Sequence, residues 1–321
     1  MKSLLPKLLG LLLLATAIMI AISRAPDRPA QSLVARWGGP PSDFIEVNGM
    51  TVHVRDVGPR DDPTPIVLIH GTGASLHTWE GWVQALQGQR RVITFDLPAF
   101  GLTGPFAGRY TPDDYGGDTY ARFVLDLLDV LKVPRAVLGG NSLGGEVAWR
   151  VAVMAPPRVE RLVLVDAAGP DFEPESVPVG FLIARIPVLN RLTEELLPRP
   201  LVAASLANVY GDPRRVSPEL VDRYFELTLR EGNRRALGLR LRQFVRGEHA
   251  ERIATIGQPT LILWGGRDRL IPPAVGRTFQ SSIRGSQLIV FDELGHVPHE
   301  EDPVRTVEAV RTFLELPAQP R

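Results

Sequence analysis

The stretch Gly139-Gly140-Asn141-Ser142-Leu143-Gly144-Gly145 separates two segments of different character. Before it, residues 135–138 form a short apolar run typical of a strand, and after it residues 146–154 have helical spacing without Gly or Pro. A Ser between a strand and a helix, with Gly two residues before and two after, matches the G-x-S-x-G pattern of a nucleophile elbow. The alternative is a glycine-rich turn that binds a phosphate or only reverses the chain.

Strand-like and helix-like segments alternate on both sides of this turn. Apolar runs of strand type occupy residues 65–69, 91–95, 161–166, 259–264 and 287–291, and helical spacing occupies residues 79–86, 113–133, 272–283 and 303–314. This alternation predicts an α/β fold with a doubly wound, mostly parallel sheet and a site at the carboxyl ends of its strands. Asn48-Gly49 between two further strand-like runs predicts an antiparallel hairpin at one edge.

Residues 170–252 interrupt the alternation, because they contain helix-like pieces and no strand-like run. We expect them to form a helical lid over the carboxyl edge of the sheet; a separate helical domain is the alternative. The chain then divides into five parts: an N-terminal membrane anchor or signal peptide (residues 1–24), a linker (25–42), the first part of the core (43–169), the lid (170–252) and the second part of the core (253–321).

The N-terminal segment predicts membrane targeting. Lys2 and Lys7 precede an uncharged apolar run from Leu8 to Ile22. This run is shorter than the roughly 20 residues of a spanning helix. Ala21-Ile22-Ser23 is an incomplete cleavage signal, so a retained anchor is favoured over a cleaved signal peptide. The expected location is therefore the membrane, with the folded part outside the cytoplasm, or secretion if the segment is cut.

Composition excludes several classes of function. The chain has 321 residues, 44% of them hydrophobic, with 36 basic and 36 acidic side chains. A net charge of zero gives no support to nucleic-acid binding. Without Cys there is no thiolate nucleophile or disulfide, and without an H-E-x-x-H pattern neither a metal nor another cofactor is expected. The oligomeric state is not indicated.

A nucleophilic Ser142 needs a base to take its proton and an acid to orient that base. His296 follows the last strand-like run and is the favoured base, with His299 as the alternative. Asp268 follows the run 259–264 and is the favoured acid, with Asp166 as its rival. All four lie where the carboxyl ends of parallel strands are expected to meet.

An oxyanion formed at Ser142 would need backbone N–H donors. The pattern assigns one donor to the residue after the nucleophile, Leu143, and the other to the loop of an earlier strand. The glycine-rich loop after residues 65–69 offers Thr72, with Gly73 as the second choice.

Taken together, the elbow, the loop at residues 70–73, Asp268 and His296 make the chain resemble the α/β-hydrolase superfamily, in particular its lidded, esterase-like branch. The resemblance implies a Ser-Asp-His triad, no cofactor, and a helical lid between the sixth and seventh strands. Relatives that dehalogenate or open epoxides have Asp at the elbow, so Ser142 implies acyl transfer. Relatives that cleave carbon–carbon bonds of ring-fission products often have an aromatic residue after the catalytic His; Val297 counts against that activity.

The sequence thus predicts a serine hydrolase that cleaves a carboxylic ester, or a related acyl bond, of a hydrophobic small molecule. The apolar stretch from Phe181 to Leu189 in the expected lid favours a hydrophobic substrate. Carbon–carbon bond hydrolysis or acyl transfer by the same triad is one alternative. A hydrolase-like protein that binds a ligand without turnover is another.

Overall fold

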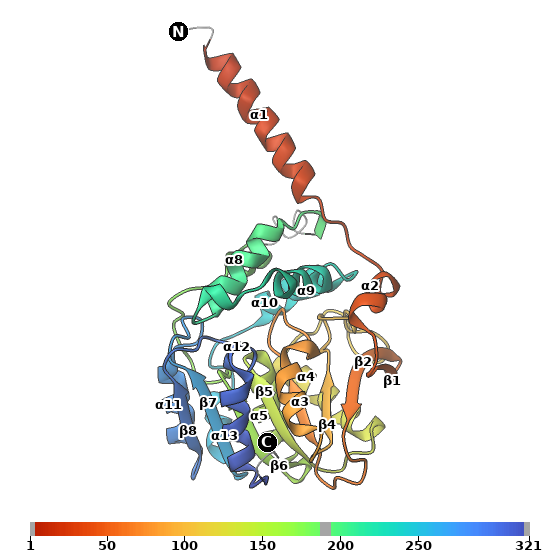
Figure 1. Ribbon diagram of the computed structural model, residues 1–321, viewed down its shortest axis with the longest axis vertical. Coiled ribbons are helices and arrows are strands. Elements are labelled where there is room, and N and C mark those ends of the chain that lie inside the picture. Colours follow the sequence, from red (N-terminus) through yellow and green to blue (C-terminus); the bar gives the residue numbers. More distant parts are fainter. Residues whose placement is uncertain (1–3, 187–193, 318–321) are drawn as a thin grey trace.

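The computed structural model describes residues 4–186 and 194–317, and its centre is an eight-stranded sheet (Figure 1). The strand order is β1-β2-β4-β3-β5-β6-β7-β8. Strand β2 pairs antiparallel with β1 and β4, and the remaining neighbours pair parallel. The expected α/β fold with a mostly parallel sheet is confirmed. The strands are β1 (Ser42–Val47), β2 (Met50–Val57), β3 (Ile66–Ile69), β4 (Val92–Phe95), β5 (Ala136–Asn141), β6 (Val159–Val165), β7 (Thr260–Gly265) and β8 (Gln287–Phe291).

Two apolar cores cover the two faces of the sheet. Strand β3 shows the division, because successive side chains of a strand point to opposite faces. Val67 and Ile69 lie in one core, whereas Ile66 and Leu68 lie in the other. Since helices cover both faces, all four side chains are buried. The first core is closed by α4 (Gly117–Val130), α5 (Leu143–Met154) and α11 (Pro273–Ser282), and the second by α3 (Glu80–Leu86) and α13 (Pro303–Phe313).

The hairpin at one end of the sheet is also confirmed. Val47 of β1 pairs with Met50 of β2, which leaves Asn48 and Gly49 as the two turn residues. Their φ angles are 53° and 83°. Asn and Gly are the residues that most readily adopt such positive values, which is why this pair specifies the turn.

Strand β8 differs from the buried strand that its apolar sequence predicts. It is the outermost strand and pairs only with β7 among the strands of the sheet. Ile289 and Val290 are 36% and 37% exposed. An edge strand has a neighbour on one side only, so an apolar run does not by itself show that a strand is central.

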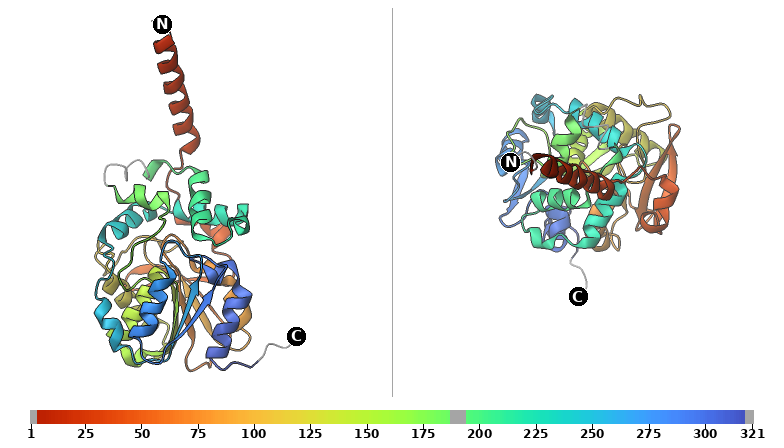
Figure 2. Two further views of the ribbon diagram at one scale, coloured as in Figure 1. Left: turned by 90° about the vertical axis from the view of Figure 1, so that its left-hand side faces the viewer. Right: turned by 90° about the horizontal axis from the view of Figure 1, so that it is seen from above.

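Among the described residues between β6 and β7, which exclude 187–193, four α-helices lie over one edge of the sheet (Figures 1 and 2). We call these helices and the described residues that connect them the helical roof; its helices are α6 (Val179–Arg185), α8 (Arg199–Val209), α9 (Pro218–Thr228) and α10 (Asn233–Gln243). Within it, α6 packs against α10 and α8, and α8 packs against α9. Of the apolar stretch from Phe181 to Leu189, the part beyond residue 186 lies outside the described residues. The domain boundaries drawn from the sequence stay a prediction.

Helix α1 (Leu4–Ser23) projects away from the rest of the chain (Figure 2). Across residues 4–186 and 194–317, no helix combines the length and the apolar character needed to cross a membrane. In the sequence, the uncharged apolar run from Leu8 to Ile22 is shorter than the roughly 20 residues of a span. The predicted membrane anchor, and the location derived from it, are therefore wrong.

The segment after α1 is tied to the helical roof by backbone hydrogen bonds. The Ala25 N–H donates to the Glu195 carbonyl (2.9 Å), and the Leu197 N–H donates to the Ser23 carbonyl (2.9 Å). Further along, the Arg28 N–H donates to the Leu229 carbonyl (2.6 Å). Residues 25–42, expected to be a linker, thus begin with ordered contacts and continue into α2 (Ala30–Trp37).

Candidate active site

The elbow at Ser142 is built by close backbone approach. Ser142 lies between β5 and α5 with φ 55° and ψ −116°, an unusual conformation for a residue with a side chain. A Cβ on Gly140 would lie 2.1 Å from the Gly144 carbonyl oxygen, and a Cβ on Gly144 would lie 2.0 Å from the Ile69 carbonyl oxygen. Only glycine fits at either position. The result is a Ser at the tip of a tight turn, at the N-terminus of α5, where negative charge is favoured.

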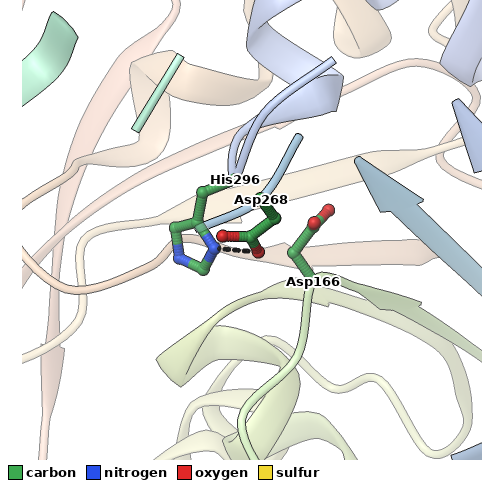
Figure 3. A group of neighbouring side chains, drawn as sticks. All are labelled: Asp166, Asp268 and His296. Carbon is green, nitrogen blue, oxygen red and sulfur yellow. Dashed lines mark hydrogen bonds and ion pairs between the residues drawn. The ribbon is translucent and has the colours of Figure 1, made fainter. Parts of the chain in front are cut away.

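His296 and Asp268 meet at the carboxyl ends of β8 and β7 (Figure 3). His296 Nδ1 lies 2.7 Å from Asp268 Oδ2, and both side chains are buried. A carboxylate can only accept, so Nδ1 carries the proton and Nε2 is the basic nitrogen. The second oxygen of Asp268 accepts hydrogen bonds from the backbone N–H groups of Leu270 (2.8 Å) and Ile271 (2.9 Å). These bonds fix the carboxylate and stabilise its ionised form.

The alternative base, His299, belongs to the core. Its Nε2 lies 3.0 Å from Thr78 Oγ1, and its ring stacks on Trp79 with 4.0 Å between the ring centroids. Burial lowers the pKa of His299 well below its ordinary value. Of the two candidates, the structure brings His296 to Asp268 and leaves His299 packed against aromatic rings.

The rival acid, Asp166, lies close to the same pair. Its Oδ1 accepts a hydrogen bond from the Gly265 N–H (2.9 Å). In the part of the chain that the structure describes, Asp166, Asp268 and His296 are the one group of acidic and His side chains with metal-ligand spacing. The hydrogen bond between His296 and Asp268 engages Nδ1 and Oδ2, one of the possible ligand atoms of each residue.

The loop after β3 runs against the elbow. A Cβ on Gly71 would lie 3.1 Å from the Ser142 Cβ. The Ala74 N–H donates to the Gly71 carbonyl (3.2 Å), so Thr72 and Gly73 are the two central residues of a tight turn. Thr72, Gly73 and Leu143 line the same cavity as Ser142. Oxyanion binding by the N–H groups of Thr72 and Leu143 stays a prediction.

His70 braces this loop. Its Nε2 accepts from the Leu97 N–H (2.9 Å), and its Nδ1 donates to the Gly71 carbonyl (2.8 Å). Burial lowers the pKa of His70, which keeps the ring neutral and preserves this arrangement of one acceptor and one donor. His70 therefore stabilises the conformation of this loop through its two hydrogen bonds.

Asn141 and Glu301 hold the His296 loop, and the sequence did not single out either of them. Asn141 Nδ2 donates to the His296 carbonyl (2.9 Å), which joins the elbow to the base. The Glu301 carboxylate accepts from the Gly295 N–H (2.9 Å) and from the Gly211 N–H (2.9 Å) at the end of α8. The position of Asn141 inside the elbow was an available signal; the contacts of Glu301 link segments too distant in sequence to be inferred.

Ser142 and His296 open into a single cavity of about 410 Å³ between the sheet edge and the helical roof. The volume is in the range of small-molecule sites. Most of its lining side chains are apolar, and most of the lining belongs to the segment between β6 and β7, which contains the roof; Phe181, Leu201 and Leu206 are examples. Two of the lining side chains form an ion pair: the Arg240 guanidinium donates to Glu146 of α5 (2.6 Å), and this buried pair connects the roof to the elbow helix.

Comparison with known proteins agrees with this architecture. The family model described as alpha/beta hydrolase fold matches residues 64–303. The chain belongs to the α/β-hydrolase family. The observed sheet agrees with this fold, and the match places the chain in a family of hydrolytic enzymes.

Three similar proteins illustrate the range of this hydrolase's relatives. The dihydrolipoyllysine-residue acetyltransferase component of the acetoin cleaving system of Pseudomonas putida is 30% identical over 86% of this chain and 70% of its own length. The 2-hydroxy-6-oxo-2,4-heptadienoate hydrolase of Pseudomonas putida is 29% identical over 84% of this chain and 95% of its own length. The crystal structure of the meta-cleavage product hydrolase CumD of Pseudomonas fluorescens has a TM-score of 0.71 and 26% identity, covering 85% of this chain and 97% of that one.

Proposed function

We propose that this protein is a serine hydrolase that cleaves a carboxylic ester, or a related acyl bond, of a hydrophobic small molecule. The observation that carries the proposal is that His296, hydrogen-bonded to Asp268, lines the same cavity as Ser142. A Ser hydroxyl becomes a useful nucleophile when an oriented imidazole takes its proton.

In the proposed reaction, Ser142 Oγ attacks the substrate carbonyl carbon while His296 Nε2 takes the hydroxyl proton. The oxyanion accepts hydrogen bonds from the N–H groups of Thr72 and Leu143. His296 then gives its proton to the leaving alcohol, and Ser142 carries the acyl group. Water, deprotonated by His296, attacks the acyl carbon; the bond from that carbon to Ser142 Oγ then breaks, His296 returns the proton to Ser142, and the acid is released. Asp268 keeps its charge throughout and stabilises the imidazolium.

The hydrophobic substrate is inferred from the lining of the cavity. Side chains such as Leu206 and Phe244 present apolar surface to any occupant, and apolar contacts favour a chain or ring over a charged group. In this proposal the helical roof serves as the lid, because its helices lie over the cavity and contribute to this apolar wall.

The decisive experiment compares wild type with Ser142→Ala on p-nitrophenyl esters of increasing acyl length. The variant should lose at least about 10⁴-fold in kcat, since the remaining groups provide only weak catalysis over water. Ser281→Ala removes an exposed hydroxyl from α11 and is the matched control, which should keep wild-type rates. Full activity in Ser142→Ala would refute the proposal.

Labelling by a fluorophosphonate separates catalysis from ligand binding alone. An activated Ser142 should react covalently, and Ser142→Ala should not. A wild-type protein that stays unlabelled would favour a binding protein without turnover.

A second candidate is hydrolysis of a carbon–carbon bond on the same triad. It is supported by the names of two relatives, a 2-hydroxy-6-oxo-2,4-heptadienoate hydrolase and a meta-cleavage product hydrolase. Val297, where such enzymes often have an aromatic residue, weighs against it. Supplying a 2-hydroxy-6-oxodienoate beside the ester series decides between them: the larger kcat/KM identifies the reaction for which the site is built.

A further inference from the structure

Asp166, at the end of β6, has no assigned role once His296 is paired with Asp268. Figure 3 shows its carboxyl group beside that of Asp268. One ligand atom from each of Asp166, Asp268 and His296 lies within 4.8 Å of the other two. Asp166 is completely buried, so water cannot stabilise a charge there. Two carboxyl groups therefore share one dry site next to a single imidazole.

The hydrogen bonds of the two carboxyl groups are unequal. Asp268 accepts three, from His296 Nδ1 and from the N–H groups of Leu270 and Ile271. Asp166 accepts one at Oδ1 from the Gly265 N–H, whereas its buried Oδ2 has no hydrogen-bond partner among the described residues. Donors stabilise an ionised carboxylate, so the site is built for the charge to reside on Asp268. A proton on Asp166 Oδ2 would need an acceptor, and an oxygen of Asp268 is nearby.

The charges around Asp166 favour the same distribution. Burial and the neighbouring carboxylate of Asp268 raise the pKa of Asp166 well above its ordinary value, and Glu301 of α12 (Pro298–Glu301) adds to the effect. His296 is the other titratable group that faces it. A protonated imidazole would favour an ionised Asp166, so the protonation of Asp166 is best examined where His296 is neutral.

We propose that Asp166 is a positioning residue that keeps its proton and donates a hydrogen bond from Oδ2 to Asp268. The pair then carries one negative charge, located on Asp268, and the added donor holds the Asp268 carboxylate toward His296 Nδ1. The consequence for catalysis rests on the proposed hydrolase function; the protonation itself does not.

Infrared spectroscopy tests the protonation directly. Wild type and Asp166→Asn are compared at pH 7 to 8 in H₂O and D₂O. Wild type should show the C=O stretch of a protonated carboxylic acid, shifted by deuterium, and Asp166→Asn should lack it. Identical spectra would overturn the proposal. Because this measurement needs no turnover, it remains decisive even if Ser142→Ala cleaves esters as fast as wild type.

The positioning role is tested by kinetics. Asp166→Ala removes the donor and should lower kcat roughly tenfold to a hundredfold, the effect of one hydrogen bond to a charged group, with little change in KM. Asp166→Asn retains an N–H donor, and Asn tolerates the φ of 43° at this position, so it should restore most of the lost rate. Equal loss in both variants would contradict the role. If Asp166→Ala does not fold, the comparison of wild type with Asp166→Asn decides.

The pH profile of kcat/KM adds a readout that a purely structural role would not affect. If Asp166 is neutral in wild type, Asp166→Asn removes no charge, and the acid limb that reports His296 stays in place. If Asp166 were ionised, removing its charge beside His296 would lower that limb by about one pH unit or more. Such a shift would overturn the proposal.

Discussion

The elbow and the helical roof face each other across one cavity, and they are specified in different ways. At the elbow, backbone atoms of β3, β5 and α5 approach so closely that Gly140 and Gly144 have no substitute. In the roof, a Cβ added to Gly180 of α6 would lie 3.6 Å from its nearest neighbour, Ser205 Oγ, which is ordinary contact. The roof is joined to the elbow by side chains, such as the Arg240–Glu146 pair.

In the proposed enzyme, the elbow therefore determines the chemistry and the roof determines which substrate is selected. The proposed nucleophile, Ser142, is positioned by short-range backbone geometry, which tolerates no added atom. The wall of the cavity is positioned by apolar packing and by an ion pair between distant segments. Such contacts can adjust, so a substitution there weakens them only in part. Substitutions at the elbow should therefore act in an all-or-none manner, whereas substitutions in the roof should act gradually.

The largest effect is expected for Gly144→Ala. The new Cβ would lie 2.0 Å from the Ile69 carbonyl oxygen, so β3 or α5 must move. We expect loss of esterase activity and a decrease in the free energy of unfolding of more than about 3 kcal/mol, measured by urea denaturation.

Gly180→Ala is the matched control for that variant. It adds the same methyl group to a helix of the roof, where the space is open and Ala is the better helix former by up to about 1 kcal/mol. Unchanged or slightly raised stability is expected. Similar losses in both variants would remove the contrast between elbow and roof.

An intermediate effect is expected for Arg240→Met. The substitution leaves buried Glu146 with Arg150 as its remaining cationic partner, whose Nε donates at 3.1 Å. Removing one member of a buried pair costs about 3–5 kcal/mol; the second cation should hold the loss near the lower end of that range. The midpoint of urea denaturation measures it, with Arg242→Met on the exposed side of α10 as the control.

The double variant Glu146→Leu with Arg240→Met tests whether the two side chains stabilise the protein as a pair. It removes both charges, so its loss should be smaller than the sum of the two single losses. Additive losses would show that the two side chains do not act as a pair.

The smallest effect is expected for Phe181→Ala in α6. The Phe181 ring lines the cavity near Gly73 of the loop after β3. Removing the ring should widen the cavity and shift the preferred ester toward longer or bulkier acyl groups. The change in kcat/KM should be about tenfold or less, as expected for one apolar contact. Leu182→Ala, on the adjacent exposed side chain, should leave the preference unaltered. The same shift in both variants would show that the roof acts only through its overall stability.

The parts of the fold that follow local rules could be predicted from the sequence. The hairpin at Asn48-Gly49, the parallel strands and the elbow each depend on residues adjacent in the chain. His296 and Asp268 each follow a strand, and parallel strands end at one edge; the structure brings the two side chains together at 2.7 Å. Their catalytic roles, and that of Ser142, stay predictions.

The remaining features depend on contacts that no local pattern encodes. Glu301 joins the His296 loop to Gly211, which lies 90 residues away in the sequence, and its neighbours give no hint of this. Helix α4 begins at Gly117, later than its apolar spacing suggests, because Asp114 instead binds the Gly116 N–H (3.1 Å) and Thr119. The exposure of β8 depends on where the sheet ends, and the apolar run of α1 has the composition of a membrane anchor without the necessary length.

The backbone bonds between residues 23–28 and the roof have a practical consequence for anyone who shortens the chain. A truncated gene that starts at the first strand would delete Ser23, Ala25 and Arg28, the partners of Leu197, Glu195 and Leu229. Leu196 and Leu197 are themselves part of the cavity wall. Substrate preferences measured on such a trimmed protein would describe an altered binding chamber, so the start codon belongs upstream of residue 23.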